Sequence, residues 1–273
     1  MNTRKIQANG ITHNLIDEGE GFPVVMIHGF PDTSALWRKQ IPTLVDAGFR
    51  CIAPDMRGRG DTDMPATPEE YSLHHPIDDV KAIMDTLDIE RAHVVCHDWG
   101  AVVGWLLATF DPARVERLVA ISVGAPGAAP RSLKQMARFW YMLLFQFPVA
   151  EEIVQRDDWA FFREWGGAHN PDLERYITDL SRPGRLTAGL NWYRANAKPE
   201  ILLAPAVNHP KVSAPTMGVW STADLALGEE QMTASASVVA NEWRFERLEG
   251  IGHWIPVEAA DQLNALLLDF LAP

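Results

Sequence analysis

Residues 94–104 read VVCHDWGAVVG, and this stretch decides the fold class. The run ending at Cys96 is typical of a buried strand, and a helical pattern begins near Gly100. Asp98 stands between them, with the small residues Cys96 and Gly100 two positions away on either side. Small residues there allow a tight turn that holds the central side chain off the strand end, close to the following helix N-terminus. The stretch therefore predicts a strand–turn–helix unit that presents Asp98 as a nucleophile.

The rest of the chain repeats this alternation of strand and helix. Besides the strand at 93–96, apolar runs lie at 24–27, 50–54, 118–123, 216–220 and 245–248, and helical patterns cover 77–87 and 259–271. Strands that are apolar throughout and separated by helices pack into a parallel sheet covered on both faces. We therefore expect an α/β fold with a mostly parallel, doubly wound sheet.

One long region breaks the alternation, because residues 126–210 contain no convincing strand and are rich in Trp, Phe, Met and Arg. Open α/β sheets bind ligands outside the carboxyl ends of their strands, so a helical insertion there would cover the site. We expect a core in two parts, residues 1–125 and 211–273, with a helical lid at 126–210.

The composition is that of an ordinary globular chain. Its 273 residues include 24 Lys and Arg and 36 Asp and Glu, giving a formal net charge of −12. Nucleic acids and anionic membranes attract clustered basic residues, so this balance argues against both partners. No apolar run approaches the roughly 20 residues of a membrane span, and residues 1–15 show no secretory signal. Two cysteines, Cys51 and Cys96, make no disulfide framework, and we expect a soluble cytoplasmic protein.

An aspartate at the turn narrows the chemistry. A serine that attacked an sp³ carbon would leave an ether, whereas a carboxylate leaves an ester that water can cleave. The carboxylate of Asp98 also needs no base to activate it, because its reference pKa is about 3.9. The turn therefore favours an alkylating electrophile, such as an epoxide or an alkyl halide. The alternative role for Asp98 is to cap the following helix.

Two loops after strands supply the expected partners of this nucleophile. The loop at residues 28–31, HGFP, follows the first apolar strand. We expect the backbone N–H groups of Phe30 and Trp99 to form an oxyanion hole there.

The base and its acid are expected near the C-terminus. His253 lies between glycine-rich residues and the last helix, and it completes the chain order nucleophile, acid, His. We expect it to deprotonate the water that cleaves the ester. Asp224 follows the strand at 216–220 and would fix the imidazole tautomer. Glu229 and Glu230 are competitors for that role.

At this point the chain resembles the α/β-hydrolase-fold epoxide hydrolases over essentially its whole length. The resemblance rests on four motifs, HGFP at 28–31, DMRGRGDTD at 55–63, HDWG at 97–100 and GHW at 252–254. It implies an α/β-hydrolase fold with a lid. One departure is Cys96, where the family more usually has glycine. The motifs are largely shared with haloalkane and fluoroacetate dehalogenases, so they leave the substrate open.

The residues that distinguish these activities lie in the lid. Epoxide hydrolases of this family use two lid tyrosines that hydrogen-bond the epoxide oxygen, and the resemblance assigns them to Tyr193, in LNWYR at 190–194, and Tyr141, in WYMLLFQ at 140–146. A phenol with a pKa of about 10 stays protonated at neutral pH and can donate to an alkoxide. Each tyrosine could instead be a core aromatic.

Dehalogenation is the alternative activity. A fluoroacetate dehalogenase would carry arginines at positions occupied by Trp99 and Val102, which counts against that activity. A haloalkane dehalogenase would use Trp99 and a second halide donor, for which Trp140 or Trp192 is available because Phe30 occupies the usual place. We expect Trp99, Trp140, Trp192 and Phe30 to contact the substrate.

The sequence thus predicts an epoxide hydrolase that forms a vicinal diol from a small hydrophobic epoxide and water. Its triad would be Asp98, His253 and Asp224, and the resemblance implies neither a cofactor nor a metal. Association into a homodimer remains open. A ligand receptor or non-catalytic scaffold on the same fold would have a broken triad, whereas all three positions are filled here.

Overall fold

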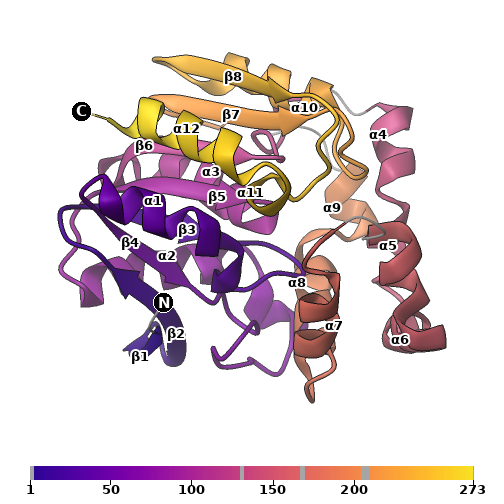
Figure 1. The fold of residues 1–273 in the computed structure, drawn as a ribbon. Helices are drawn as coiled ribbons and strands as arrows, with labels where there is room; N and C mark the ends of the chain where they lie inside the picture. Colours follow the sequence, from indigo (N-terminus) through magenta and orange to yellow (C-terminus); the bar gives the residue numbers. More distant parts are fainter. Residues whose placement is uncertain (1–2, 130–131, 167–169, 204–208, 273) are drawn as a thin grey trace.

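The computed structural model describes residues 3–129, 132–166, 170–203 and 209–272. Eight strands form one sheet in the order β1-β2-β4-β3-β5-β6-β7-β8 (Figure 1). β2 is antiparallel to both neighbours, and all pairs from β4 to β8 are parallel. The strands are β1 (Thr3–Ala8), β2 (Ile11–Glu18), β3 (Phe22–Ile27), β4 (Phe49–Pro54), β5 (Ala92–His97), β6 (Val115–Ile121), β7 (Thr216–Ser221) and β8 (Trp243–Leu248). This confirms the expected α/β class.

The central strands are buried on both faces because their side chains alternate between two apolar cores. On β5, Val94 and Cys96 belong to one core and Val95 to the other. The helices α2 (His74–Thr86) and α3 (Trp99–Phe110) cover the first core. The helices α1 (Ile41–Asp46) and α12 (Ala260–Leu271) cover the second core and lie on the near face in Figure 1. The sheet is therefore doubly wound, as expected.

Shorter elements complete the core. The 3-10 turns are η1 (Ser34–Lys39), η2 (Pro68–Tyr71), η3 (Pro112–Arg114) and η5 (Ala234–Val238), and the short helices are α10 (Glu229–Thr233) and α11 (Ile255–Glu258). Within the described ranges, the structure contains no helix that is both long and apolar enough to cross a membrane.

The described part of the segment between β6 and β7 consists of helices joined by turns and irregular stretches, and it contains no named strand. Its elements are α4 (Leu133–Arg138), α5 (Trp140–Leu144), α6 (Ala150–Phe161), the π-helical turn η4 (Phe162–Gly166), α7 (Leu173–Leu180), α8 (Arg185–Asn196) and α9 (Pro199–Leu203). Figure 1 shows these helices gathered beyond one end of the sheet. Residues 130–131, 167–169 and 204–208 of the expected lid at 126–210 lie outside the described residues.

The sheet begins with a hairpin that the sequence analysis did not predict. β1 and β2 pair antiparallel through a tight turn at Asn9 and Gly10, whose φ angles are 47° and 78°. Both residues have positive φ, which an Asn-Gly pair tolerates, and such a pair is a recognised hairpin signal. The hairpin adds two strands at the edge of the sheet, far from the carboxyl end of β5.

Candidate active site

Asp98 occupies a strained turn between β5 and α3. Its backbone angles are φ 54° and ψ −125°, a region that residues other than glycine rarely adopt. Such a conformation costs on the order of 1–3 kcal/mol and persists only where the surroundings enforce it. Here the segments around Asp98 pack so closely that the neighbouring positions Gly29 and Gly100 have no room for a larger residue. A Cβ on Gly100 would collide with the carbonyl oxygen of Ile27, and one on Gly29 would collide with the Asp98 carboxylate.

The two oxygens of the Asp98 carboxylate have different surroundings. Oδ1 accepts a hydrogen bond from the backbone N–H of Phe30 at 2.8 Å, and the N–H of Trp99 also donates to the carboxylate. Oδ2 lies 3.5 Å from Nε2 of His253. The two N–H groups expected to form an oxyanion hole therefore both contact Asp98, and Oδ2 is left facing the imidazole.

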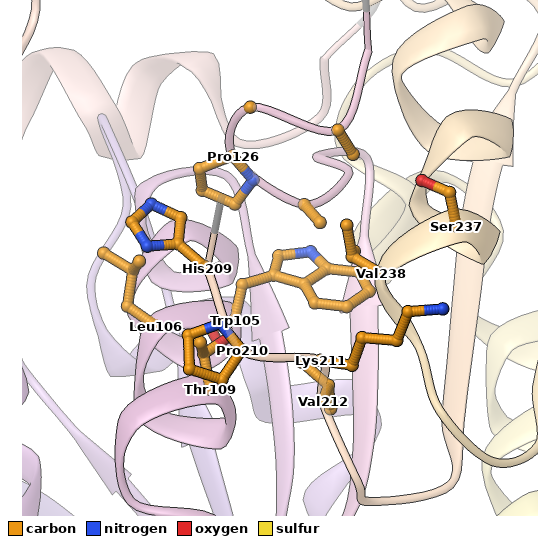
Figure 2. Close-up of a pocket in the computed structure, with 13 residues that line it drawn as sticks. Trp105, Leu106, Thr109, Pro126, His209, Pro210, Lys211, Val212, Ser237 and Val238 are labelled. Atoms are coloured by element: carbon orange, nitrogen blue, oxygen red, sulfur yellow. The ribbon is translucent and has the colours of Figure 1, made fainter. Parts of the chain in front are cut away.

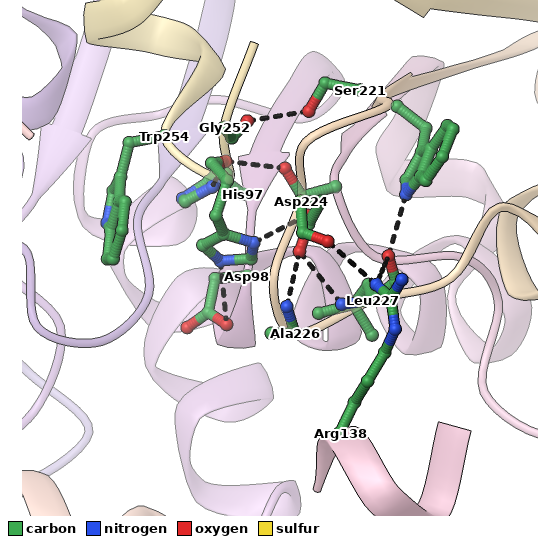
Figure 3. A network of polar contacts seen from close by, with 12 residues as sticks. His97, Asp98, Arg138, Ser221, Asp224, Ala226, Leu227, Gly252 and Trp254 are labelled. Carbon is green, nitrogen blue, oxygen red and sulfur yellow. Dashed lines mark hydrogen bonds and ion pairs between the residues drawn. The ribbon is translucent and has the colours of Figure 1, made fainter. Parts of the chain in front are cut away.

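Asp224 orients His253 from the other side (Figure 3). Its Oδ2 lies 2.8 Å from Nδ1 of the imidazole, while its Oδ1 accepts from the N–H groups of Ala226 at 2.8 Å and Leu227 at 2.9 Å. A carboxylate on Nδ1 places the imidazole proton there and leaves Nε2 facing Asp98. The structure therefore brings the three expected triad residues together.

The two competing acids lie elsewhere. Glu229 and Glu230 are in α10, where Glu229 pairs with Arg247 at 3.2 Å and Glu230 lies 3.9 Å from Lys134. Neither contact reaches the imidazole, so Asp224 is the residue that occupies the acid position.

The backbone of His253 is anchored beneath the turn. Its carbonyl oxygen accepts from Oγ of Ser122 at 2.8 Å and lies 3.0 Å from Nε2 of His97. Burial lowers the pKa of His97 to about 4, so this imidazole is neutral at pH 7. His97 therefore supports His253 by binding its main-chain carbonyl from below the turn.

Charge in the site is concentrated on the Asp98–His253–Asp224 row. Burial alone would lower the pKa of His253, but Asp224 and Asp98 on its two nitrogens raise that pKa to about 10. Burial would likewise raise the pKa of Asp98, yet the hydrogen bond and charge of His253 hold it below the ordinary value. In the free protein the imidazolium therefore lies between two carboxylates.

Two buried tyrosines come from different lid helices to the same cavity. Tyr141 is on α5 and Tyr193 on α8, their ring centroids are 5.9 Å apart, and both line the cavity with Asp98 and His253. Burial, together with the nearby Asp98 charge, raises both phenol pKa values well above 10. Both hydroxyls therefore remain protonated donors at neutral pH.

This catalytic cavity is small and aromatic. Its volume is about 20 Å³, room for about one water molecule, so a larger molecule fits only after lining side chains shift. Among the described residues, its lining consists of Phe30, Pro31, Asp98, Tyr141, Phe162, Trp165, Tyr193, Leu225, Ala226, His253 and Trp254.

The four residues expected to contact the substrate line different cavities in the structure. Phe30 lines the catalytic cavity. Trp99 and Trp192 line an adjoining cavity on the other side of Phe30, and the indole of Trp192 donates to the Arg57 carbonyl at 3.2 Å. The expectation that Trp140 contacts the substrate is wrong. Trp140 is 48% exposed and lines a separate groove on the lid. Adjacent residues of a helix point about 100° apart, so α5 turns Tyr141 inward and Trp140 outward.

Several site residues were missed by the sequence analysis. Phe162 and Trp165 line the cavity from η4, and only their place in an aromatic-rich lid gave a signal. Arg59 lies behind Phe30, with its guanidinium 4.7 Å from the ring centroid. Among the described residues, neither terminal nitrogen of Arg59 meets a hydrogen-bond acceptor. A buried cation without a hydrogen-bond acceptor is unusual. Arg59 lies in the DMRGRGDTD motif at 55–63, but the sequence analysis assigned that residue no role.

A wider cavity of about 330 Å³ lies where the lid segments meet the core (Figure 2). Figure 2 shows Pro126 and Pro210, from the two ends of the lid segment, beside the indole of Trp105. Its described lining contains no carboxylate, so this cavity offers no nucleophile of the kind found at Asp98. The described ranges also contain no cluster of three His, Cys, Asp or Glu side chains that could hold a metal ion.

Comparison with known proteins gives the class to which this fold and site belong. A family model described as alpha/beta hydrolase fold matches residues 23–260. The chain therefore belongs to the α/β-hydrolase fold family.

Several similar proteins carry names that specify an activity. Epoxide hydrolase A of Mycobacterium tuberculosis is 31% identical over 98% of this chain and 96% of its own length. The AB hydrolase superfamily protein YfhM of Bacillus subtilis is also 31% identical, over 97% and 96%. The crystal structure of epoxide hydrolase A from Mycobacterium thermoresistibile superposes with a TM-score of 0.82 at 30% identity, covering 99% of this chain and 98% of that one. An epoxide hydrolase mutant from Bacillus megaterium, in complex with a diol product, gives a TM-score of 0.88 at 25% identity over 98% and 99%.

Proposed function

We propose that the chain is an epoxide hydrolase that works through a covalent ester on Asp98. The observation that carries this proposal is the meeting of four groups at one cavity. The nucleophile Asp98, the base His253 and the phenols Tyr141 and Tyr193 all line it. The first two provide a cycle of alkylation and hydrolysis, and the phenols provide the acid that opening an epoxide requires. The near-full-length relatives named epoxide hydrolases support the same activity.

In the first step, Oδ2 of Asp98 attacks an epoxide carbon and the bond from that carbon to the ring oxygen breaks. The electrons of that bond go to the oxygen, and the resulting alkoxide takes a proton from Tyr141 or Tyr193. Oδ1 becomes the carbonyl oxygen of the ester and keeps the hydrogen bond from Phe30, which is 2.8 Å long in the free enzyme.

In the second step, water cleaves the ester. Once Asp98 is alkylated it carries no charge, so the pKa of His253 falls. The imidazolium then gives up its Nε2 proton, which returns to the tyrosinate left by the first step, and the neutral imidazole can accept a proton from water. The hydroxide attacks Cγ of Asp98, and the negative charge forms on Oδ1 between the N–H groups of Phe30 and Trp99. Collapse of this intermediate breaks the bond between Cγ and Oδ2, and the imidazolium protonates Oδ2 as it leaves in the diol. The water oxygen stays on Asp98, whose new carboxyl group returns its proton to His253.

The lining favours an uncharged apolar substrate. Among the described lining residues, Asp98 and His253 are the charged side chains, and each is already paired. An aromatic wall without a free counter-charge binds flat apolar groups and penalises charged ones.

Dehalogenation would need free donors for a halide, and none of the three indoles expected to supply them is free in the catalytic cavity. The indole of Trp192 donates to the Arg57 carbonyl at 3.2 Å, the side chain of Trp99 donates to Tyr193, and Trp140 lies outside the cavity. The arrangement of donors therefore favours the epoxide over the alkyl halide.

A single turnover of styrene oxide in ¹⁸O-labelled water tests the mechanism. With enzyme in excess, we expect the label in the peptide that contains Asp98 and unlabelled oxygen in the first diol. Direct entry of the label into that diol would contradict the ester. Turnover of 1-bromobutane, measured in parallel, distinguishes a dehalogenase, and no turnover of either compound would favour a non-catalytic binder.

A further inference from the structure

The first lid helix, α4, is joined by hydrogen bonds to the loop that carries Asp224. We call residues 224–228 the acid loop. Nη1 of Arg138 donates to the carbonyl oxygens of Asp224 at 2.7 Å and Leu227 at 3.0 Å. Nε2 of Gln135 donates to the carbonyl of Ala226 at 2.7 Å, and its Oε1 accepts from the N–H of Gly228 at 2.8 Å. Two side chains of α4 therefore hold four of the five residues of the acid loop.

These hydrogen bonds attach α4 to the core, and little apolar packing accompanies them. Gln135 and Arg138 are three residues apart, so they share one face of the helix, and Figure 3 shows Arg138 reaching from α4 to the loop. None of the residues of α4 is buried, and Leu133 is 84% exposed. Because little apolar surface holds this helix down, its position depends on the polar bonds to the acid loop.

The remainder of the lid attaches to a different part of the core. α7 is joined to the segment after β3 by Arg175, which pairs with Asp32, and by the hydroxyl of Tyr176, which donates to Asp32 at 2.9 Å. Arg182 and Arg185 contact the segment that follows β4. Asp98 and its N–H donors lie on the loops after β3 and β5. The nucleophile is therefore held by elements that α4 does not contact through Gln135 or Arg138.

The acid loop in turn sets the geometry of the triad. The N–H groups of Ala226 and Leu227 bind Oδ1 of Asp224, which directs Oδ2 to the imidazole of His253. The peptide unit that carries the Leu227 N–H has its carbonyl oxygen, that of Ala226, bound by Gln135. Arg138 binds the carbonyl oxygens of Asp224 and Leu227, which belong to the peptide units on either side of these two. A shift of these peptides would therefore move the N–H donors and the carboxylate together.

We propose that Arg138 and Gln135 are positioning residues for the hydrolysis step, and that lid helix α4 acts through the acid loop to hold Asp224 on His253. The proposal rests on the proposed function, because it assigns the contact to the second of its two steps. It follows that ester hydrolysis depends on α4 being docked, whereas attack by Asp98 does not. The lid then contributes to both steps, through Tyr141 and Tyr193 in the first and through α4 in the second.

Rapid-quench single turnovers of styrene oxide test this assignment. Intact-protein mass spectrometry follows the ester, and chromatography follows the diol. For Arg138→Met we expect ester hydrolysis to slow by about 10- to 100-fold, the range that follows from a small misplacement of a catalytic group. Alkylation should change by less than about 3-fold, so the ester accumulates. Arg138→Lys keeps a donor and should restore part of the hydrolysis rate, and Gln135→Met should slow the same step.

Lys134→Ala is the matched control, because Lys134 is on the same helix and lies 3.9 Å from Glu230, beyond the acid loop. We expect it to match the wild type in both steps, and thermal unfolding checks that each variant is folded. Arg138 is three residues before Tyr141, so a displaced phenol would slow alkylation instead. Equal losses in both steps, or unchanged hydrolysis in Arg138→Met, would overturn the proposal. Absence of any ester in the wild type would instead refute the proposed function.

Discussion

At the scale of single residues, the state of His253 depends on whether Asp98 is charged. The imidazole lies between two carboxylates, and Asp224 and Asp98 outweigh the effect of burial to raise its pKa to about 10. In the proposed mechanism, alkylation would remove one of these charges, and the pKa would then fall because the charge of Asp98 would no longer stabilise the protonated imidazole. In that mechanism, the first step would produce the neutral imidazole that the second step uses as a base.

Replacing His253 by Gln should separate the two steps. The amide cannot take a proton from water, so we expect the ester on Asp98 to form and persist, with steady-state diol production lower by at least about 10³-fold. Intact mass spectrometry after mixing with styrene oxide checks this. Asp98→Asn is the control, and no ester should be detected in it directly after mixing with styrene oxide. Fast turnover by His253→Gln would mean that another group is the base.

The pKa shifts also predict the pH dependence of alkylation. The pKa of Asp98 is held below 3.8, so the nucleophile is ionised above that value and its reactivity is lost only as pH falls through it. The phenol pKa values are raised above 10, so the donors are lost only at higher pH. We expect single-turnover alkylation rates to be flat from about pH 5 to about pH 9. A rate that halves near pH 6.5 would contradict this.

Each phenol should matter in the first step. In Tyr193→Phe the developing alkoxide loses a donor in a dry aromatic cavity, and we expect alkylation to slow by about 10²- to 10³-fold. Tyr141→Phe should do the same. Tyr71→Phe is the control, since the Tyr71 hydroxyl donates to the Pro65 carbonyl at 2.8 Å, outside the catalytic cavity. Rapid-quench kinetics with styrene oxide distinguish these outcomes.

At the scale of elements, the junction of β5 and α3 depends on close backbone packing. In Gly100→Ala the new Cβ would meet the Ile27 carbonyl oxygen, and we expect the free energy of unfolding to fall by at least about 2 kcal/mol, although alanine favours helices. Gly48→Ala is the comparison, because a Cβ there meets nothing within 4 Å and only its φ of +86° is unfavourable. It should cost about 1 kcal/mol. Urea unfolding measures both, and equal losses would refute the steric argument.

The sequence predicted the elements that bury apolar runs and the loops that carry Asp98, Asp224 and His253. The strands at 24–27 and 216–220 were found because they are apolar on both faces. The hairpin of β1 and β2 was missed because its strands are partly exposed and polar, although the Asn9–Gly10 turn could have revealed it.

Side-chain directions within the lid were harder to predict. Tyr141 reaches the cavity and its neighbour Trp140 does not, and both lie in the same aromatic run. Which face of α5 turns inward is decided by packing with α8 and η4, which are distant in sequence. The contact of Arg138 with the acid loop likewise joins residues 86 positions apart, and no local pattern indicates it.

At the scale of the whole molecule, the lid is docked by a buried charge cluster. Asp32 has a fully buried side chain, pairs with Arg175 and accepts from the hydroxyl of Tyr176 at 2.9 Å. Arg175 and Arg38 both bind Asp172. This cluster joins α7 to the core through groups that would be costly to leave unpaired.

Removing Asp32 should therefore weaken the fold. In Asp32→Ala the partly buried guanidinium of Arg175 loses a partner, and we expect the free energy of unfolding to fall by about 3 kcal/mol. Asp61→Ala is the control, because its pair with Arg182 is 56% and 42% exposed, and such a pair contributes less than about 1 kcal/mol. Urea unfolding at neutral pH measures both variants, and a similar small loss in each would contradict the importance of the cluster.

The aromatic lining around Asp98 also bears on which form of a compound reaches the nucleophile. An epoxide that carries a carboxylic acid would have to give up the water around its anion for a surface of rings, next to a carboxylate of like charge. Its neutral form avoids that loss. For such a compound the rate of turnover would follow the protonated fraction in solution, and so it would rise with acidity even while the enzyme's own groups keep the same charge.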